Sequence, residues 1–394
     1  EAKEANLAYL SVLWDSYKDE VSRNREMTSD EIQYLVDNAD KVLTDKSGSI
    51  SEAFLDYGLV DKLLPRTKTR SYLRELFGES EDKKSFASIS GFEYFQLIRS
   101  EKTKQQGKNK IAVIVAKGTI VDGVQPPGTI GGDSTSRLIR EAYEDENVKA
   151  IVLRVDSGGG GVFASEQIRQ ELLEAKEKGL KVIASMGNVA ASGGYWISAN
   201  ADEIWASHNT ITGSIGIFGL LPTFNRALNE IGINSDGVKT SKIDLSGDIT
   251  QPLSEGLSNI IQSEIEYGYK RFIGLVSEAR NIPIDQVDQI AQGRVWAGTS
   301  AKELGLVDKI GNLKMAIKRA AELAEISEYT TYYPTQSVDW RTQLAKRFSG
   351  YVSWVIPPYI KDNLVVKNAI NALKDINQFN DPKGIYIICE DCPI

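Results

Sequence analysis

Two glycine-containing segments that each follow an apolar run carry the residue types best suited to chemistry. In the first, Asp156-Ser157 leads into four consecutive glycines, Gly158 to Gly161. In the second, Ser192 stands between a pair of alanines and a pair of glycines. Glycine permits positive φ and lets a ligand approach main-chain N–H groups closely. A serine at a strand-to-helix turn can point its Oγ into a cleft. Together the segments predict a nucleophile that faces main-chain donors for an oxyanion.

Each segment also has other interpretations. The glycine run resembles a phosphate loop, but it lacks a G-K-[ST] ending and does not match G-x-G-x-x-G with an acidic partner; it could also be a flexible turn. Ser192 could simply cap a helix, because Ala-Ser-Gly also describes ordinary N-caps. If the two segments converge, the amide of Gly193 and one from the 158–161 loop would flank the same oxygen. Each such donor contributes about 3 kcal/mol.

The chain contains a single histidine, which decides between mechanisms. His208 follows Ser192 by sixteen residues and lies in what the sequence indicates is a surface turn. Without it no Ser-His-Asp triad can form, so a lysine whose pKa is lowered by desolvation is the favoured base. Lys239 and Lys242 lie in a turn-rich stretch downstream, and the hydroxyl of Ser214 could orient such an amine.

Alternating elements must position these residues. The apolar, β-branched runs 111–115, 150–155 and 180–186 predict buried strands, and 136–146 and 164–178 predict helices. This alternation predicts an α/β fold with a parallel sheet and right-handed crossovers. In such sheets functional groups gather at the carboxyl ends of the strands, where both segments lie.

Composition limits the class of protein. The 394 residues are enough for two or three domains, and a net charge of −8 argues against a nucleic-acid partner. The two cysteines, Cys389 and Cys392, lie near the C-terminus, so they do not provide a disulfide framework for the core. A disulfide in the tail is possible, whereas zinc would need four ligands. The chain contains no run of about 18 apolar residues. Because it begins at Glu1, we expect a processed or engineered fragment.

An internal echo indicates a domain duplication. Residues 57–63 (YGLVDKL) reappear as 304–310 (LGLVDKI), and Arg25 upstream of the first copy parallels Arg280. The first copy lacks the long segment that precedes the second. We therefore expect four parts: 1–75 as the C-terminal remnant of a first repeat, 76–110 as a linker, 111–330 as a complete second repeat, and 331–394 as an extension.

The sequence resembles the signal peptide peptidase A (protease IV) family, in its long two-repeat form, truncated at the N-terminus. The matching stretches are 154–160, 186–198, 212–216, 293–296 and 305–308. The resemblance implies a crotonase-like or Clp-protease-like α/β fold of repeated ββα units, with a partial second repeat that is mainly helical. It further implies that Ser192 is the nucleophile of a Ser-Lys dyad, that Gly160 and Gly193 form the oxyanion hole, and that Ser214 hydrogen-bonds the base. No metal or organic cofactor is implied.

The chain departs from the family pattern at the base. In two-repeat members the general-base lysine lies in the first repeat, upstream of the helix that matches residues 5–20, and this chain starts after that point. In single-repeat members the lysine follows the serine in the same repeat, at the position of Lys242, with Lys239 as a neighbour. Gly158 also replaces a proline that is common in the family. The base is therefore expected to be Lys242, Lys239 or a lysine absent from this chain.

The resemblance also implies a biological setting. The expected substrates are cleaved signal peptides and other apolar peptides, at the periplasmic side of a bacterial inner membrane. We expect a homo-oligomer, held at the membrane through a missing N-terminal segment, and no nucleic-acid partner. Two alternatives remain. One is a crotonase-like acyl-CoA hydratase or isomerase, which would not require Ser192, and the other is a catalytically incomplete assembly module.

Overall fold

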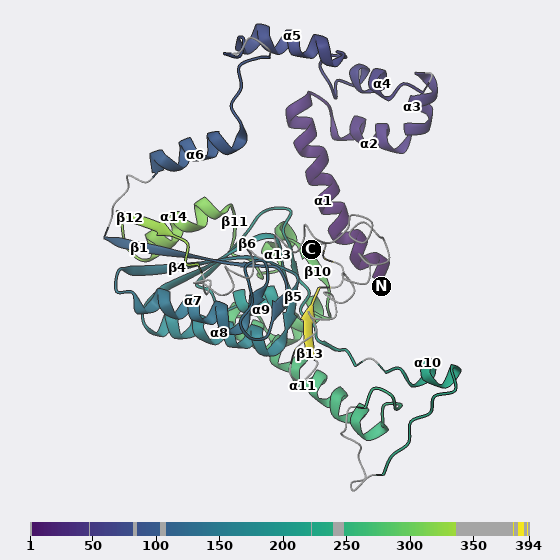
Figure 1. Ribbon diagram of the computed structural model, residues 1–394, viewed down its shortest axis with the longest axis vertical. Helices are drawn as coiled ribbons and strands as arrows, with labels where there is room; N and C mark the ends of the chain where they lie inside the picture. The colour runs from purple at the N-terminus through teal and green to yellow at the C-terminus, as the bar shows by residue number, and fades with distance from the viewer. Residues whose placement is uncertain are drawn as a thin grey trace, which may run out of the picture. The chain divides into compact units, whose positions relative to one another are not determined.

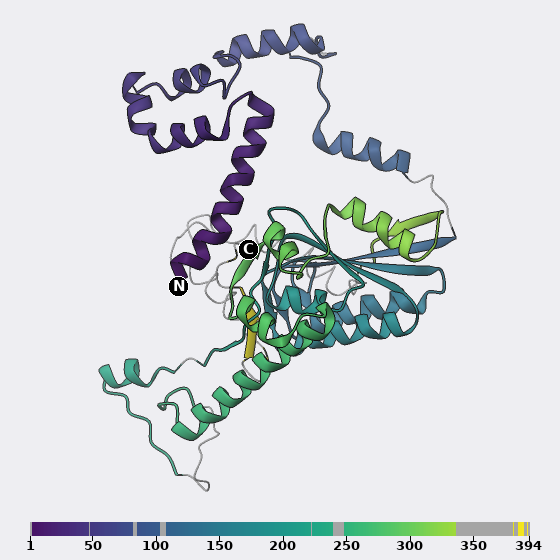
Figure 2. The ribbon, with the colours of Figure 1, turned by 180° about the vertical axis from the view of Figure 1, so that it is seen from behind.

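A computed structural model of the protein is shown from opposite sides in Figure 1 and Figure 2. It describes residues 2–46, 48–81, 85–102, 108–221, 223–238, 248–335, 381, 385–389 and 392. The chain forms two compact units, one of residues Leu10–Gln106 and the other of Gly107–Ile394 with Glu1–Tyr9. Each unit is described by itself. Within the described residues, no helix combines the length and apolar character needed to cross a bilayer.

Helices are the regular elements of the smaller unit in its described part. They are α1 (Ala2–Arg25), α2 (Ser29–Asp37), α3 (Ala39–Asp45), α4 (Ile50–Asp56), α5 (Arg66–Phe77) and α6 (Gly91–Lys102). A capping box starts α2, because Thr28 accepts a hydrogen bond from the amide of Glu31 while the Glu31 side chain accepts one from the amide of Thr28. Among the few buried side chains of this unit are Ile32 and Val42. The unit therefore has a small core of its own.

The internal echo has a structural counterpart. In both copies a long helix, α1 or α11 (Glu255–Arg280), ends at an arginine that contacts a glycine and an aspartate of the echoed segment. The two sets are Arg25 with Gly58 and Asp61, and Arg280 with Gly305 and Asp308. In both sets the arginine Nε donates to the glycine carbonyl, at 2.9 Å and 3.0 Å. The same contact at equivalent positions supports a duplication.

A mainly parallel sheet forms the centre of the larger unit. Its strand order is β10-β8-β6-β4-β1-β12, with β7 pairing β6 and β11 at the side. The bounds are β1 (Asn109–Lys117), β4 (Val148–Ser157), β6 (Lys181–Ala191), β7 (Glu203–Ala206), β8 (Ile211–Gly213), β10 (Val295–Ala297), β11 (Lys309–Ile310) and β12 (Tyr329–Tyr332). The pair β10–β8 is antiparallel and the other pairs of this sheet are parallel. The predicted α/β class with a parallel sheet is confirmed.

A second, smaller sheet lies at the ends of the long strands. Its order is β3-β2-β5-β13-β9. The bounds are β2 (Ile120–Val121), β3 (Ile130–Gly131), β5 (Gly159–Gly161), β9 (Phe218–Gly219) and β13 (Ile385–Ile388). Each of the long strands β1 and β4 leads into a short strand of this sheet and then into a helix. These are the ββα units that the resemblance implied.

Helices cover both faces of the main sheet (Figure 1). The helices α7 (Gly132–Glu144) and α8 (Val162–Glu177) pack on one face, where Ile151, Leu153 and Val155 of β4 join their core. The alternate residues of β4, among them Val152, pack with α14 (Leu313–Leu323) on the other face. Side chains of a strand alternate between faces, so a strand buried on both sides must be apolar throughout, as β4 largely is.

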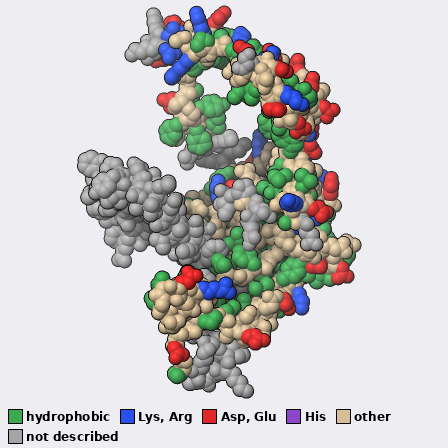
Figure 3. Space-filling view, turned by 90° about the vertical axis from the view of Figure 1, so that its right-hand side faces the viewer, with side chains coloured by type: hydrophobic (Ala, Val, Ile, Leu, Met, Phe, Trp, Pro, Cys, Tyr) green, Lys and Arg blue, Asp and Glu red, His purple; other side chains and the backbone are tan. Residues whose placement is uncertain are grey.

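The remaining helices in the described part of the larger unit are α9 (Gly193–Ser198), α10 (Asn225–Glu230), α12 (Ile284–Ile290) and α13 (Gly298–Glu303). Of these, α9 is fully buried and starts directly after Ser192. On the face drawn in Figure 3, acidic, basic and apolar side chains are interspersed. This mixture fits the modest net charge of −8.

Candidate active site

Ser192 occupies a tight turn between β6 and α9. Its backbone is at φ +55° and ψ −115°, a conformation that a residue with a side chain rarely adopts. Two main-chain hydrogen bonds hold it there, from Ser192 N to the Gly213 carbonyl (2.8 Å) and from Trp196 N to the Ser192 carbonyl (2.9 Å). The hydroxyl makes no capping hydrogen bond with the helix. Ser192 therefore occupies the N-cap position without capping the helix through its side chain, and the backbone strain has no capping function to explain it.

The glycine run reaches this turn. Gly159 has φ +107°, and a Cβ added to Gly193 would lie 3.1 Å from the amide nitrogen of Gly160. The two amides that were predicted to form an oxyanion hole therefore lie close together. A Cβ on Gly160 would lie 1.9 Å from the carbonyl oxygen of Ile120, which shows why this position needs glycine. The close approach of three backbone segments explains the glycines without a phosphate ligand.

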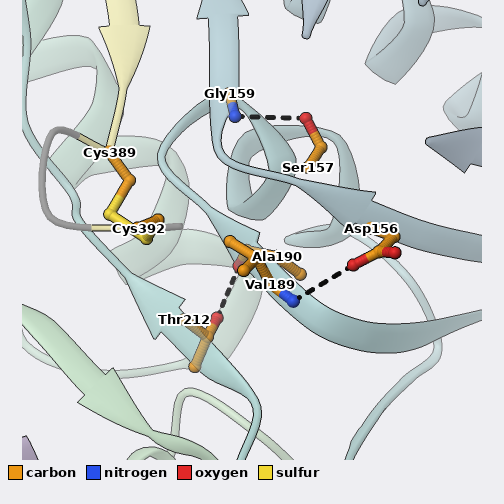
Figure 4. Close-up of a disulfide and its surroundings, with 8 residues drawn as sticks. All are labelled: Asp156, Ser157, Gly159, Val189, Ala190, Thr212, Cys389 and Cys392. Carbon is orange, nitrogen blue, oxygen red and sulfur yellow. Dashed lines mark hydrogen bonds between the residues drawn. A yellow bond between two sulfur atoms is a disulfide. The ribbon is translucent and has the colours of Figure 1, made fainter. Parts of the chain in front are cut away.

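Side-chain hydrogen bonds fix both strand ends, as Figure 4 shows. Ser157 Oγ accepts from the amide of Gly159 at 3.1 Å, which holds the start of the glycine strand. Asp156 Oδ1 accepts from the amide of Val189 at 3.3 Å and so joins the end of β4 to β6. These contacts give the polar residues of the first segment a positioning role.

Ser214 lies beside Ser192 across the sheet. It directly follows β8, whose residue Gly213 pairs with Ala191, so the two serines come immediately after paired residues. Ser214 also has a positive φ of +49°, and its amide donates to the carbonyl of Arg294 at 2.8 Å. It lines a cavity of about 430 Å³ together with residues that include Ile388. A group that enters this cavity would reach the Ser214 side of the site.

Neither lysine candidate can be placed, because Lys239 and Lys242 lie outside the described residues. The identity of the base stays a prediction. His208 is exposed, and its Nδ1 lies 3.2 Å from Thr299 Oγ1. Among the residues that the structure describes, Ser192 Oγ has no hydrogen-bond partner, so His208 does not hydrogen-bond to it. In the part of the chain that the structure describes, no group of three or more His, Cys, Asp or Glu side chains is arranged to bind a metal ion.

The open cleft that was expected at Ser192 is closed in this structure. The residue is 1% exposed, and its Oγ is both buried and unpartnered. The hydroxyl does lie next to the glycine strand, as predicted. What the sequence analysis missed is a C-terminal segment that packs here: β13 pairs with β5 and contacts α9. Its four apolar residues are typical of a buried strand, and that signal was available in the sequence.

A disulfide follows this missed strand. Cys389 and Cys392 are bonded to each other, and both are buried. The amide of Cys389 donates to the carbonyl of Gly158 at 2.6 Å, which brings the tail to the beginning of the glycine run. Figure 4 shows the disulfide beside the strand ends that carry Asp156 and Ser157. The possible tail disulfide is thus present in the structure, at the candidate site.

A half-buried carboxylate supports the helix that follows Ser192. Glu166 of α8 accepts hydrogen bonds from Arg169 Nε and from Trp196 Nε1, both at 2.8 Å, and pairs with Arg271 at 2.6 Å. Burial alone would raise the pKa of Glu166, but hydrogen bonds from Arg169, Gln170 and Trp196 outweigh it and lower the pKa to about 2. This network joins α9 to α8 and α11.

Glu166→Gln is expected to destabilise the fold by about 2 kcal/mol at pH 7, because the amide cannot satisfy the four cationic or polar side chains that the carboxylate binds. In the wild type the ionised form is favoured by folding, so this stability is fully present above the ordinary carboxyl pKa and is lost as pH falls towards 2. The variant should lack that part of the acid dependence. Thermal unfolding between pH 7 and 3 measures both effects. Glu174→Gln, which breaks the exposed pair with Lys178, is the control and should change stability little.

The geometry described so far is a strained serine turn with two main-chain amides beside it, and nucleophilic acyl-transfer sites use groups of the same kind. Comparison with known proteins agrees with this class. The model of peptidase family S49 matches residues 174–327. Protease 4 of Salmonella typhi is 41% identical over 402 residues, which cover 99% of this chain and 63% of that protein. Protease 4 of Haemophilus influenzae is 38% identical, over all of this chain and 65% of that protein.

A further relative, slr0021 of Synechocystis, is 33% identical over 224 residues, which cover 56% of this chain and 76% of that protein. The chain therefore belongs to peptidase family S49, the family of signal peptide peptidase A. It spans less than two thirds of the length of the two Protease 4 relatives.

Solved structures give weaker similarities. A mutant of ClpP1 from Listeria monocytogenes has a TM-score of 0.36 and 16% identity, over 56% of this chain and 99% of that one. A mutant of the 1510-N membrane-bound stomatin-specific protease has a TM-score of 0.39 and 15% identity, over 59% of this chain and all of that one. The family assignment rests on the sequence relationship.

Proposed function

We propose that this chain carries the nucleophile of a serine endopeptidase that works with a lysine base. The observation that carries the proposal is the Ser192 turn: a hydroxyl that caps nothing, held at positive φ, beside the converging amides of Gly160 and Gly193. Such strain at a polar residue is typical of functional sites. The relationship to proteins named Protease 4 supports peptide hydrolysis as the reaction.

The mechanism follows from these groups. Ser192 Oγ attacks the peptide carbonyl carbon while its proton passes to a neutral lysine amine. The carbonyl oxygen becomes an oxyanion and is stabilised by the amides of Gly160 and Gly193. When the tetrahedral intermediate collapses, the lysine ammonium donates its proton to the leaving amine, and an acyl-enzyme remains. Water then attacks the ester, passing a proton to the lysine, and Ser192 is regenerated with release of the carboxylic acid.

The base in this mechanism is Lys242, Lys239 or a lysine outside this chain, and Ser214 is proposed to orient it. Ser214 is suited to this role because it follows the strand that pairs with β6, directly beside Ser192. Its hydroxyl would hold the amine without adding charge, which keeps the neutral form of the lysine accessible.

We further propose that the substrates are apolar peptides, among them cleaved signal peptides, at the periplasmic side of a bacterial inner membrane. A relative from Enterococcus faecium that is named signal peptide peptidase SppA supports this substrate class. A homo-oligomer held at the membrane by a segment outside this chain belongs to the same proposal.

A fluorophosphonate probe tests the proposal. It reacts with an activated serine by forming a covalent phosphorus–oxygen bond and losing fluoride, and mass spectrometry of the digested protein locates the adduct. We expect the adduct on Ser192 and none in Ser192→Ala. A crotonase-like acyl-CoA enzyme or an inactive assembly module would form no adduct at this residue. Absence of labelling in the folded chain would contradict a Ser192 that is activated by a base within this chain.

A further inference from the structure

The turn that follows α12, residues 291–294, contacts Ser214 through its backbone. The amide of Ser214 donates to the carbonyl of Arg294 at 2.8 Å. The amide of Gly293 donates in the opposite direction, to the carbonyl of Ile215, at 3.0 Å. These bonds fix the backbone of Ser214 and of the residue after it. The position of Ser214 in the site therefore depends on the position of the 291–294 turn.

The backbone of this region is strained. Gln292 has φ +57° and Gly293 has φ +77°, so two consecutive residues of the turn are left-handed. Ser214, on the other side of the hydrogen bonds, has φ +49°. Residues with a side chain persist in such conformations when the surrounding structure over-determines them. Contacts from outside the turn are therefore needed to hold it.

Tyr269 of α11 provides such contacts through its hydroxyl. The hydroxyl donates to Asp288 Oδ1 at 2.6 Å, and Asp288 lies in α12, just before the turn. The carbonyl of Asp288 accepts from the amide of Ala291, the first residue of the turn, at 3.3 Å. A hydrogen bond from the backbone of Gln292 reaches the tyrosine oxygen as well. One hydroxyl thus joins α11 both to the helix before the turn and to the turn itself.

This hydroxyl keeps its proton near neutral pH. Burial and the hydrogen bond to Asp288 raise the pKa of Tyr269 to about 12. The hydroxyl can therefore donate to Asp288 while its oxygen accepts from the amide of Gln292. Tyr269→Phe would remove both bonds, whereas Asp288→Asn keeps an acceptor oxygen for the hydroxyl.

The first copy of the internal echo offers a comparison. There Trp14 Nε1 donates to Gln33 Oε1 at 2.6 Å, and these positions correspond to 269 and 288 of the second copy. The helix that carries Gln33 continues past the point where α12 ends and the turn begins. An indole nitrogen can only donate, whereas a tyrosine hydroxyl donates and accepts. A tyrosine at position 269 is thus suited to bind the helix and the turn at once.

Tyr269 and Ser214 also line the same cavity of about 430 Å³, together with Gln292 and Gly293. An amine that Ser214 orients would reach it through this cavity. A shift of the turn would therefore change both the direction of the Ser214 hydroxyl and the space for the amine. Misplacement of a catalytic group by about 1 Å can lower a rate about 10²-fold.

We propose that Tyr269 is a positioning residue for the reaction: its hydroxyl fixes the 291–294 turn and, through the turn, the orientation of Ser214 toward the base. The inference rests on the proposed function of Ser192 and Ser214. Tyr269 acts through Ser214 and exchanges no proton with the substrate. Its loss should therefore lower the rate of the reaction and leave substrate binding unchanged.

Hydrogen exchange at single amides tests the structural step, whether or not the chain is active. In Tyr269→Phe the amides of Ser214 and Gly293 should exchange about tenfold faster than in the wild type, because the turn that bonds to both opens more often. The amides of β4 should keep their exchange rates. Asp288→Asn should exchange as the wild type does. Unchanged exchange at Ser214 and Gly293 in Tyr269→Phe would overturn the inference.

The rate at which a fluorophosphonate labels Ser192 tests the catalytic step. We expect Tyr269→Phe to react about ten to a hundred times more slowly than the wild type. Asp288→Asn should retain most of the wild-type rate, because it preserves the hydrogen bond. With an apolar peptide as substrate, Tyr269→Phe should lower kcat and leave KM unchanged, since Ser214 acts on the base and not on the substrate.

Tyr143→Phe is the matched control. The Tyr143 hydroxyl donates to Glu171 Oε2 at 2.9 Å, so this variant also removes a tyrosine hydroxyl that joins two helices of the larger unit. It should change neither the exchange at Ser214 nor the labelling rate. Asp288→Ala removes the acceptor and should behave as Tyr269→Phe does. It serves if Tyr269→Phe does not fold, as judged by circular dichroism.

The two proposals fail in different ways. If the wild type takes the label and Tyr269→Phe reacts as fast, Ser192 is activated but Tyr269 does not position its partner. An equal loss of rate in Asp288→Asn would assign the effect to the charge of Asp288, which also contradicts the inference. If the wild type takes no label, activation by a base within this chain fails, and the exchange rates still decide whether Tyr269 holds Ser214.

Discussion

Replacing Ser192 by alanine should abolish peptide cleavage and leave the protein at least as stable as before. Loss of the nucleophile lowers kcat by a factor of about 10⁴ or more in serine proteases. The stability should rise by about 1 kcal/mol, because the substitution removes a buried hydroxyl that has no partner. Serine and alanine at position 192 would have the same strained φ of +55°, so the strain does not contribute to the difference in stability. Cleavage of an apolar peptide and thermal unfolding measure the two effects.

Ser198→Ala is the matched control for this prediction. Ser198 is also buried and lies in the same short helix, but its Oγ donates to the Gly194 carbonyl at 2.7 Å. Its loss should lower the stability by about 1 kcal/mol and leave cleavage unchanged. A gain of stability in Ser192→Ala and a loss in Ser198→Ala would show that the Ser192 hydroxyl destabilises the fold in which it is held. If Ser192→Ala is destabilised like Ser198→Ala and still cleaves peptide, Ser192 is a structural residue.

The elements around the site could be predicted because their signals are local. The strands β4 and β6 are largely apolar along their length, as expected of buried strands. The helix α8 has its buried residues on one face, as expected of an amphipathic helix. The close approach of Gly160 and Gly193 followed from two residue patterns at the ends of adjacent parallel strands. Position on a sheet is fixed by burial and by the short connections, so neighbouring strand ends converge.

The position of β13 could not be predicted in this way. An apolar run such as Ile385 to Ile388 indicates a strand, but it does not tell which edge the strand joins. The pairing with the glycine strand depends on hydrogen bonds between backbone groups, which every residue except proline offers alike. For the same reason the closed state of Ser192 has no signature in its own neighbourhood. The base is a different case, because its two candidates in this chain lie outside the described residues.

Strain and burial at Ser192 are linked through β13. A hydroxyl that is to attack a carbonyl must not be satisfied by the protein itself, and the turn achieves this by keeping Oγ away from the amides of α9. If β13 were absent, the hydroxyl could hydrogen-bond to water or to the base. With β13 in place it is desolvated and unpaired. A bound substrate would desolvate it too, but would offer a carbonyl carbon for the hydroxyl to attack.

Gly193→Ala is expected to lower kcat about 10² to 10³-fold with little change in KM, since oxyanion donors act mainly in the transition state. The new Cβ would lie 2.9 Å from Ser165 Oγ and 3.1 Å from both Gly159 Cα and Gly160 N. Contacts this short require a neighbour to move by a few tenths of an ångström, and both Gly159 Cα and Gly160 N belong to the glycine strand. We therefore expect the Gly160 amide to shift from its position. Steady-state kinetics on an apolar peptide measures the loss.

A second substitution separates catalysis from crowding. Ser165 Oγ donates to the Gly161 carbonyl at 2.8 Å, so Ser165→Ala alone should cost about 1 kcal/mol of stability. In the double variant the contact with Ser165 Oγ is gone while those with the glycine strand remain. The loss of stability in the double variant should be smaller than the sum of the losses in the two single variants, because the two positions are in contact. Its kcat should stay as low as in Gly193→Ala. Recovery of kcat in the double variant would show that Gly193 matters for packing against Ser165 and that its amide does not stabilise an oxyanion.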